Sequence, residues 1–124
     1  MQQALSYSCG CMAEVLVAMG KPEEAKPYFR ENVEICEKLA AAEESVTNLD
    51  QLGTAYVEAA SVEGGEEQCQ LMAKAVSVYE RLCAMEPQNQ RFQSDLASLR
   101  DYLKELEQKN AKRGGFLKKL FGKN

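Results

Sequence analysis

The sequence predicts an all-α fold built from a repeated pair of helices. Three observations predict it: apolar residues recur at three- and four-residue spacings, strand patterns are absent, and one short block of sequence occurs twice. The two copies of that block read EKLAAAEE at 37–44 and ERLCAMEP at 80–87. Another helix is expected after each block, so each unit of the repeat is predicted to be an antiparallel pair of helices.

Five helices are expected, and local residues set several of their ends. Their predicted spans are Ala4–Met19, Pro22–Ala42, Val46–Ala60, Glu66–Met85 and Gln90–Gln108. Gly20 suits the left-handed position that ends the first helix, and Pro22 suits the first turn of the second. We expect Ser61–Gly65 to be an exposed, mobile turn, because adjacent glycines have high backbone entropy; a loop folded over a binding face is the alternative.

The apolar faces of these helices are expected to meet in one core, since 124 residues suit a single domain. The core is predicted to contain Leu16, Phe29, Leu39, Leu52, Tyr56, Ala75, Tyr79, Leu82 and Leu96. A small residue follows a large one at Leu52-Gly53, which would let the second helix of that unit approach the first closely.

The composition excludes several classes of protein. The chain has no histidine, so catalysis by Ser-His or Cys-His arrangements is excluded. The five cysteines lack the paired spacing of a zinc site, and we expect neither a metal nor another cofactor. There is no secretory signal and no apolar run long enough to span a membrane, so the protein is expected in the cytoplasm.

Charge is distributed unevenly along the chain. Residues 1–99 hold seven Lys or Arg against sixteen Asp or Glu, whereas residues 100–124 hold eight against three. The acidic body argues against a nucleic acid as ligand, because binding phosphates requires clustered cations on a folded surface.

Particular residues of the repeat resemble those of a known family. Leu52-Gly53, Tyr56, Ala75, Tyr79 and Pro87 occur in one unit, and Met12-Ala13, Leu16, Gly20, Ala25 and Phe29 occupy comparable positions in the unit before it. In this order and phase the chain resembles the tetratricopeptide repeat family, in its bacterial long-period form of about 42 residues. The resemblance implies a right-handed α-solenoid of about two and a half repeats over residues 1–108, ending in a capping helix.

The resemblance also implies a function, that of a non-catalytic adaptor or scaffold that binds a protein or peptide segment in a concave groove. Transferring the family's facings gives these groove residues: Tyr7, Glu14, Val17, Asp50, Gln51, Thr54, Val57, Glu58, Arg91 and Asp95. The lysines and asparagines with which some members clamp a chaperone's terminal carboxylate are missing there. The expected partner is therefore basic or apolar.

The basic tail, residues 109–124, is predicted to be a separate segment beyond a hinge at Gly114-Gly115. Four of its apolar residues share one helical face: Phe116, Leu117, Leu120 and Phe121. Three states are considered: a frayed terminus, weak contact with an anionic membrane surface, and docking into the acidic groove of the same or a neighbouring chain. Docking into a groove is preferred to the membrane, because only four apolar residues are available for insertion.

Two other functions remain open from the sequence. The first is an enzyme that uses Glu14, Asp50 and Glu58 for acid–base chemistry, although nothing in the sequence orients these carboxylates. The second is a structural oligomerisation unit whose exposed repeat ends or tail pair with another copy of the chain.

Overall fold

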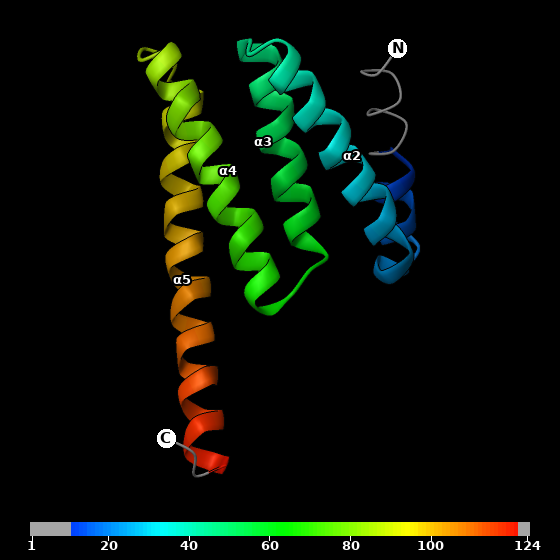
Figure 1. The fold of residues 1–124 in the computed structure, drawn as a ribbon, viewed down its shortest axis with the longest axis vertical. Coiled ribbons are helices and arrows are strands. Elements are labelled where there is room, and N and C mark those ends of the chain that lie inside the picture. The colour runs from blue at the N-terminus through cyan, green and yellow to red at the C-terminus, as the bar shows by residue number, and fades with distance from the viewer. Residues whose placement is uncertain (1–10, 122–124) are drawn as a thin grey trace.

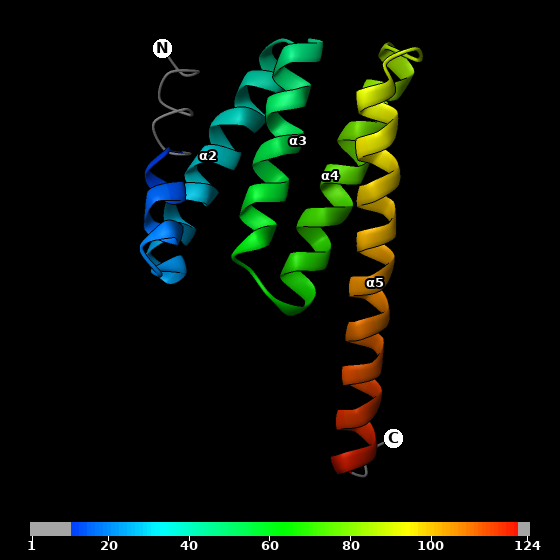
Figure 2. The same cartoon turned by 180° about the vertical axis from the view of Figure 1, so that it is seen from behind.

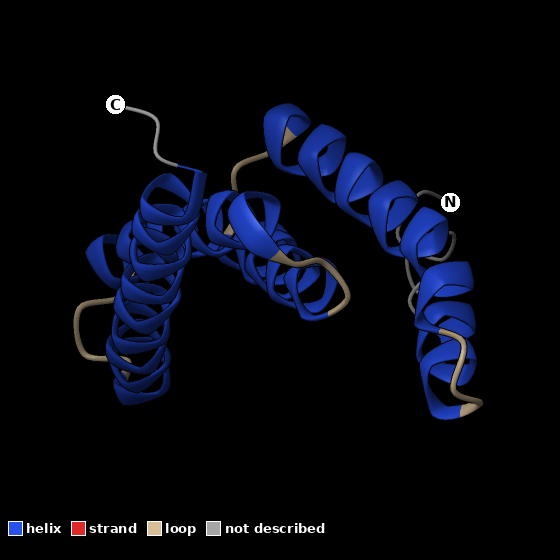
Figure 3. Cartoon of the chain, turned by 90° about the horizontal axis from the view of Figure 1, so that it is seen from below, coloured by secondary structure: helices blue, strands red, loops and turns tan. Residues whose placement is uncertain are grey.

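The protein is a row of helices, described by a computed structural model for the backbone of residues 11–121 and the side chains of residues 11–111. A helical segment at 11–18 is followed by α2 (Pro22–Ala42), α3 (Val46–Ser61), α4 (Gly65–Met85) and α5 (Gln90–Phe121). No strand occurs in this part of the chain (Figure 3), which confirms the all-α prediction. In Figures 1 and 2 the chain reverses direction at each turn, and α2, α3, α4 and α5 pack in sequence order.

Gly20 ends the first helical segment, as predicted. Its φ of 77° is the left-handed conformation that glycine adopts without strain. Its N–H donates to the carbonyl oxygen of Val17 at 3.0 Å, and the N–H of Lys21 donates to that of Leu16 at 2.8 Å. These two bonds satisfy carbonyls at the helix end and turn the chain into α2.

The turn between α2 and α3 is fixed by side chains. The Ser45 hydroxyl accepts a hydrogen bond from the backbone N–H of Asn48 at 3.1 Å and so caps α3. The side-chain amide of the buried Asn48 donates back to the carbonyl oxygens of Leu39 and Glu43, at 3.3 and 2.8 Å. The start of α3 is thereby held against the end of α2.

The last helix is longer than the sequence predicts. We expected it to end at Gln108, with a hinge at Gly114-Gly115, but α5 continues without a break to Phe121. Both expectations are wrong for a physical reason. A glycine costs a helix interior only about 1 kcal/mol, and adding residues to a helix already formed against α4 needs no new nucleation.

The core is one cluster that draws residues from every described helix, beside a small second cluster of Ala60, Met72 and Leu106. The following predicted core residues are buried: Phe29, Leu52, Tyr56, Ala75, Tyr79, Leu82 and Leu96. Leu16 and Leu39 are only partly buried, so the prediction overstated how deeply these two residues are buried. Both lie within the last turn or so of their helices, where fewer neighbours cover a side chain.

Gly53 allows α3 and α4 to pack closely. A Cβ atom added at this position would lie 2.7 Å from Cε2 of Tyr79 on α4. That is well inside van der Waals contact, so only glycine fits without a shift of the ring. The prediction that the Leu52-Gly53 pair permits a close approach is confirmed.

Candidate functional site

Two acidic side chains of the predicted groove meet between the first helical segment and α3. The side chain of Glu14 lies within hydrogen-bonding reach of Glu58, although the two residues are 44 positions apart in the sequence. Glu58 is half-buried, whereas Glu14 is exposed. Burial, together with the hydrogen bond and the charge of Glu14, raises the pKa of Glu58 from 4.5 to about 7.

A second group of predicted groove residues meets where α3, α4 and α5 adjoin. Nη2 of Arg91 on α5 lies 2.6 Å from Oδ2 of Asp50 on α3, and its Nε lies 3.7 Å from Oδ2 of Asp95. The Tyr79 hydroxyl of α4 lies 3.5 Å from the other oxygen of Asp50. The guanidinium of Arg91 also lies over the ring of Phe92, 4.9 Å from its centre. Asp50 is thus partly neutralised by a cation of the chain itself.

The remaining predicted groove residues make no such contacts with one another. Gln51 and Thr54 are exposed on α3, Val17 is 42% exposed, and Val57 is half-buried against the core. Tyr7 lies outside the described residues. We use the term acidic face for the surface formed by Glu14, Asp50, Gln51, Thr54, Glu58, Arg91 and Asp95.

The backbone of the four residues predicted for tail docking is part of α5. These residues are Phe116, Leu117, Leu120 and Phe121. Their side chains lie outside the described part of the structure, so docking of the tail stays a prediction.

Two hollows lie on the opposite side of α3, between α2 and α4, and sequence reasoning missed both. Their volumes are about 420 and 230 Å³, and both are lined by Glu37 and Lys74. The Tyr56 hydroxyl donates to Oε2 of Glu37 at 2.6 Å, and Nζ of Lys74 lies 5.9 Å from the centre of the Tyr56 ring. A sequence signal was present, since Tyr56 pairs an apolar ring with a hydroxyl that needs a partner when buried.

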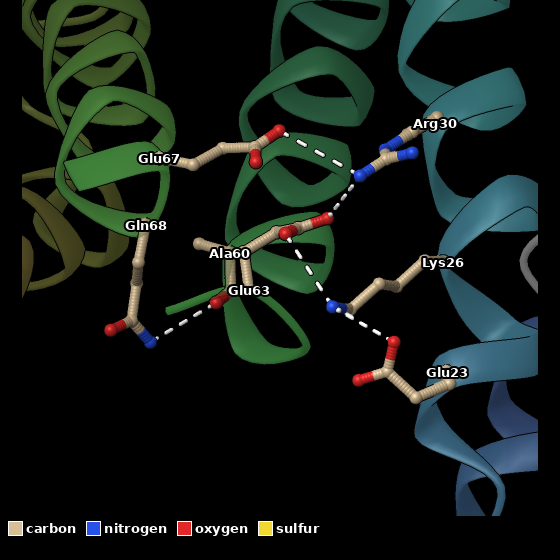
Figure 4. Close-up of polar contacts among 7 residues, drawn as sticks. All are labelled: Glu23, Lys26, Arg30, Ala60, Glu63, Glu67 and Gln68. Atoms are coloured by element: carbon tan, nitrogen blue, oxygen red, sulfur yellow. Dashed lines mark hydrogen bonds and ion pairs between the residues drawn. The ribbon is translucent and has the colours of Figure 1, made fainter. Parts of the chain in front are cut away.

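The turn between α3 and α4 is anchored to α2 by ion pairs (Figure 4). The side chain of Glu63 is only 7% exposed, and its two oxygens lie 3.0 Å from Arg30 Nη2 and 3.8 Å from Lys26 Nζ. Arg30 also reaches Glu67, the third residue of α4, at 3.9 Å. The prediction of an exposed turn at Ser61–Gly65 is correct for Ser61 and Gly64 but wrong for Glu63, whose carboxylate is held by two cations of α2. The alternative, a loop over the binding face, is wrong as well, since this turn packs against α2.

The described residues supply little that could hold a metal ion. No group of three or more His, Cys, Asp or Glu comes together among them, and none of the four cysteines they include forms a disulfide. None of the described helices has the length and apolar character needed to cross a bilayer.

Comparison with known proteins gives no relative. No protein-family description, no curated protein and no solved structure matches this chain.

Proposed function

We propose that the chain is a non-catalytic protein-binding module, a solenoid of antiparallel helix pairs similar to tetratricopeptide repeats, which binds a peptide segment on its acidic face. The single observation that carries the proposal is the meeting of predicted groove residues across helices. Glu14 lies beside Glu58, and Asp50 contacts Arg91, and the facings of the family that the chain resembles had assigned all four residues to one groove. The alternating course of the helices in Figure 1 and the contact of Gly53 with Tyr79 also support a repeat of helix pairs.

The charges of the acidic face favour a basic or apolar segment as ligand. Its four acidic residues, Glu14, Asp50, Glu58 and Asp95, outnumber its one cation, Arg91. An acidic peptide would be repelled, and the carboxylate of a peptide C-terminus would find only Arg91, which Asp50 already engages. Lysine or arginine side chains of a ligand would instead find the carboxyl groups of Glu14 and Glu58 side by side.

The same geometry argues against catalysis. A carboxyl group with a pKa near 7 suits acid–base chemistry, and Glu58 has one. Its partner Glu14 is exposed, however, so water reaches the pair freely. Acid–base catalysis by carboxyl groups works best where water is excluded, and an open surface suits binding better.

Titration of the chain with two synthetic peptides tests the proposal. One peptide alternates lysine with leucine and the other glutamate with leucine, so only their charge differs. We expect the lysine peptide to shift the amide NMR signals of Gln51 and Thr54 and the glutamate peptide to leave them unchanged. Glu14→Gln/Glu58→Gln should weaken binding about tenfold, whereas the control Glu31→Gln/Glu107→Gln, which neutralises two exposed carboxylates elsewhere, should not. Equal binding of both peptides, or no shifts on α3, would refute the proposal.

A second candidate function is a structural oligomerisation unit, which exposed apolar side chains at one end of the row favour. Met12, Val15 and Met19 are 47, 53 and 60% exposed, and their spacing places them on one side of the first helical segment. Sedimentation at two protein concentrations tests this candidate. A concentration-dependent dimer that Val15→Glu abolishes would favour it, and a monomer throughout would exclude it.

A further inference from the structure

The end of α5 runs beyond the other described helices. Figures 1 and 2 show α5 continuing past the turn between α3 and α4. Among the described side chains of α5, those nearest this end that contact the body are Leu106, buried against Ala60 and Met72, and Asn110, whose side-chain amide donates to Cys69 Sγ at 3.0 Å. We call residues 111–121 the α5 overhang.

Apolar positions recur within the overhang on the line of α5 that faces α4, beyond Arg113, which lies on the same line about two turns after Leu106. Leu117 follows Leu106 by about three turns, and Phe121 follows Leu103 by about five, so these positions continue the line that faces α4 nearer the start of α5. Phe116 and Leu120 border the same line. Within the described part of the chain, no element lies beside α5 at these positions in Figures 1 and 2. The line of apolar positions therefore extends beyond α4, the helix that covers its first part.

The overhang is also strongly basic. It contains Lys112, Arg113, Lys118 and Lys119 and no acidic residue, whereas the rest of the chain is acidic. A short helix that combines cations with leucine and phenylalanine is suited to lie in the interface of an anionic bilayer, with its apolar residues at the boundary of the acyl chains. Each cation near such a surface strengthens binding about fivefold.

We propose that the α5 overhang docks the protein on an anionic membrane surface. The acidic face of a second copy is the competing partner, and self-association distinguishes it from a membrane in the test below. A bilayer offers unengaged phosphates and an apolar phase together. The overhang is already helical, so docking requires little further ordering of the backbone. The proposal does not depend on what the acidic face binds.

Co-sedimentation of the full chain with lipid vesicles tests the proposal. We expect binding to phosphatidylcholine vesicles that contain phosphatidylglycerol, weaker binding as salt is added, and none to phosphatidylcholine alone. Lys118→Gln/Lys119→Gln and Phe116→Ala/Phe121→Ala should each reduce binding more than about tenfold. The matched control Lys38→Gln/Lys104→Gln removes the same charge from exposed positions of the body and should retain binding within about twofold.

Three outcomes would overturn the proposal. The first is absence of binding to phosphatidylglycerol vesicles by the parent chain, and the second is an equal loss of binding in the control. The third is loss of self-association, rather than of vesicle binding, in the two overhang variants, which would assign the overhang to the acidic face of another copy. Far-UV circular dichroism should show the same melting curve for the parent and for both overhang variants, so a loss of binding reports the membrane contact itself.

Discussion

Glu58 is a carboxyl group whose surroundings in the folded chain favour its protonated form. Burial and the hydrogen bond to Glu14 raise its pKa from 4.5 to about 7. The folded chain therefore binds this proton more tightly than the unfolded chain does. The free energy of unfolding that Glu58 contributes must fall as pH rises from about 4.5 to about 7, opposite to the effect of an ion-paired carboxylate.

We predict that Glu58→Gln raises the free energy of unfolding at about pH 8 by about 1 kcal/mol and leaves it unchanged at about pH 4. The effect is modest because the group is only half-buried and water screens its charge. Urea denaturation at the two pH values measures it. Glu107→Gln, which is exposed on α5, should change neither value. A Glu58→Gln protein that is destabilised equally at both values would contradict the raised pKa of Glu58.

A methyl group added at Gly53 should destabilise the packing of α3 against α4. We predict that Gly53→Ala lowers the free energy of unfolding by about 1–3 kcal/mol, although alanine is the better helix former. The Tyr79 ring cannot move aside easily, because it is buried and packs edge-on against Phe92 with their centres 6.4 Å apart. Gln51→Ala, exposed on the same helix, is the control and should be neutral or slightly stabilising in a thermal melt. A stable Gly53→Ala protein would mean that the two helices can separate at little cost.

At the scale of helices, the sequence correctly predicts where a helix ends when residues at that end determine it. Gly20 and Pro22 identify the first turn by their own backbone preferences, and both positions are as predicted. The contacts that hold the turn at 62–64 could not be predicted from neighbouring residues in the sequence. Glu63 is held by Lys26 and Arg30, which precede it by more than thirty residues, and no local pattern reveals such a partner. Gly114 and Gly115 led to the opposite error. Local preference predicted a break at these glycines, but α5 continues through both because the helix before them is already formed.

The ion pairs of Glu63 give a prediction about the turn between α3 and α4. Glu63→Gln should lower the free energy of unfolding by about 1–3 kcal/mol, because it leaves Lys26 and Arg30 without their buried counter-charge. It should also make the bond after Glu63 or Gly64 an early site of limited proteolysis, whereas the parent turn should resist. Glu66→Gln, which is exposed two residues beyond the turn, is the matched control and should alter neither result. Early cleavage of the parent turn would show that the ion pairs do not hold it in solution.

At the scale of the whole molecule, the facings of the family that the chain resembles assigned Glu14, Glu58, Asp50 and Arg91 to one groove. In the structure Glu14 lies beside Glu58 and Asp50 contacts Arg91, while the groove itself stays a prediction. That Arg91 would neutralise Asp50, and that the pKa of Glu58 would be raised beside Glu14, depends on side-chain conformations. The hollows between α2 and α4 depend on the distance between those helices. Sequence periodicity predicts which residues share one face of a helix, but it does not predict the distance between two helices.

A single core that includes every described helix should also unfold as one unit. Leu52 lies in that core with only 7% of its side chain exposed. Leu52→Asp would bury a carboxylate without a partner at a cost of at least about 3 kcal/mol, a large part of the about 5–15 kcal/mol by which domains are stable. We predict that the whole chain loses its helical circular dichroism, while Gln51→Asp, exposed on the adjacent position, keeps it. Arrays of repeats can instead melt in parts. Amide NMR signals of α4 and α5 that persist while those of α2 and α3 collapse would show that the helices unfold in separate units and that the continuity of the core does not couple them.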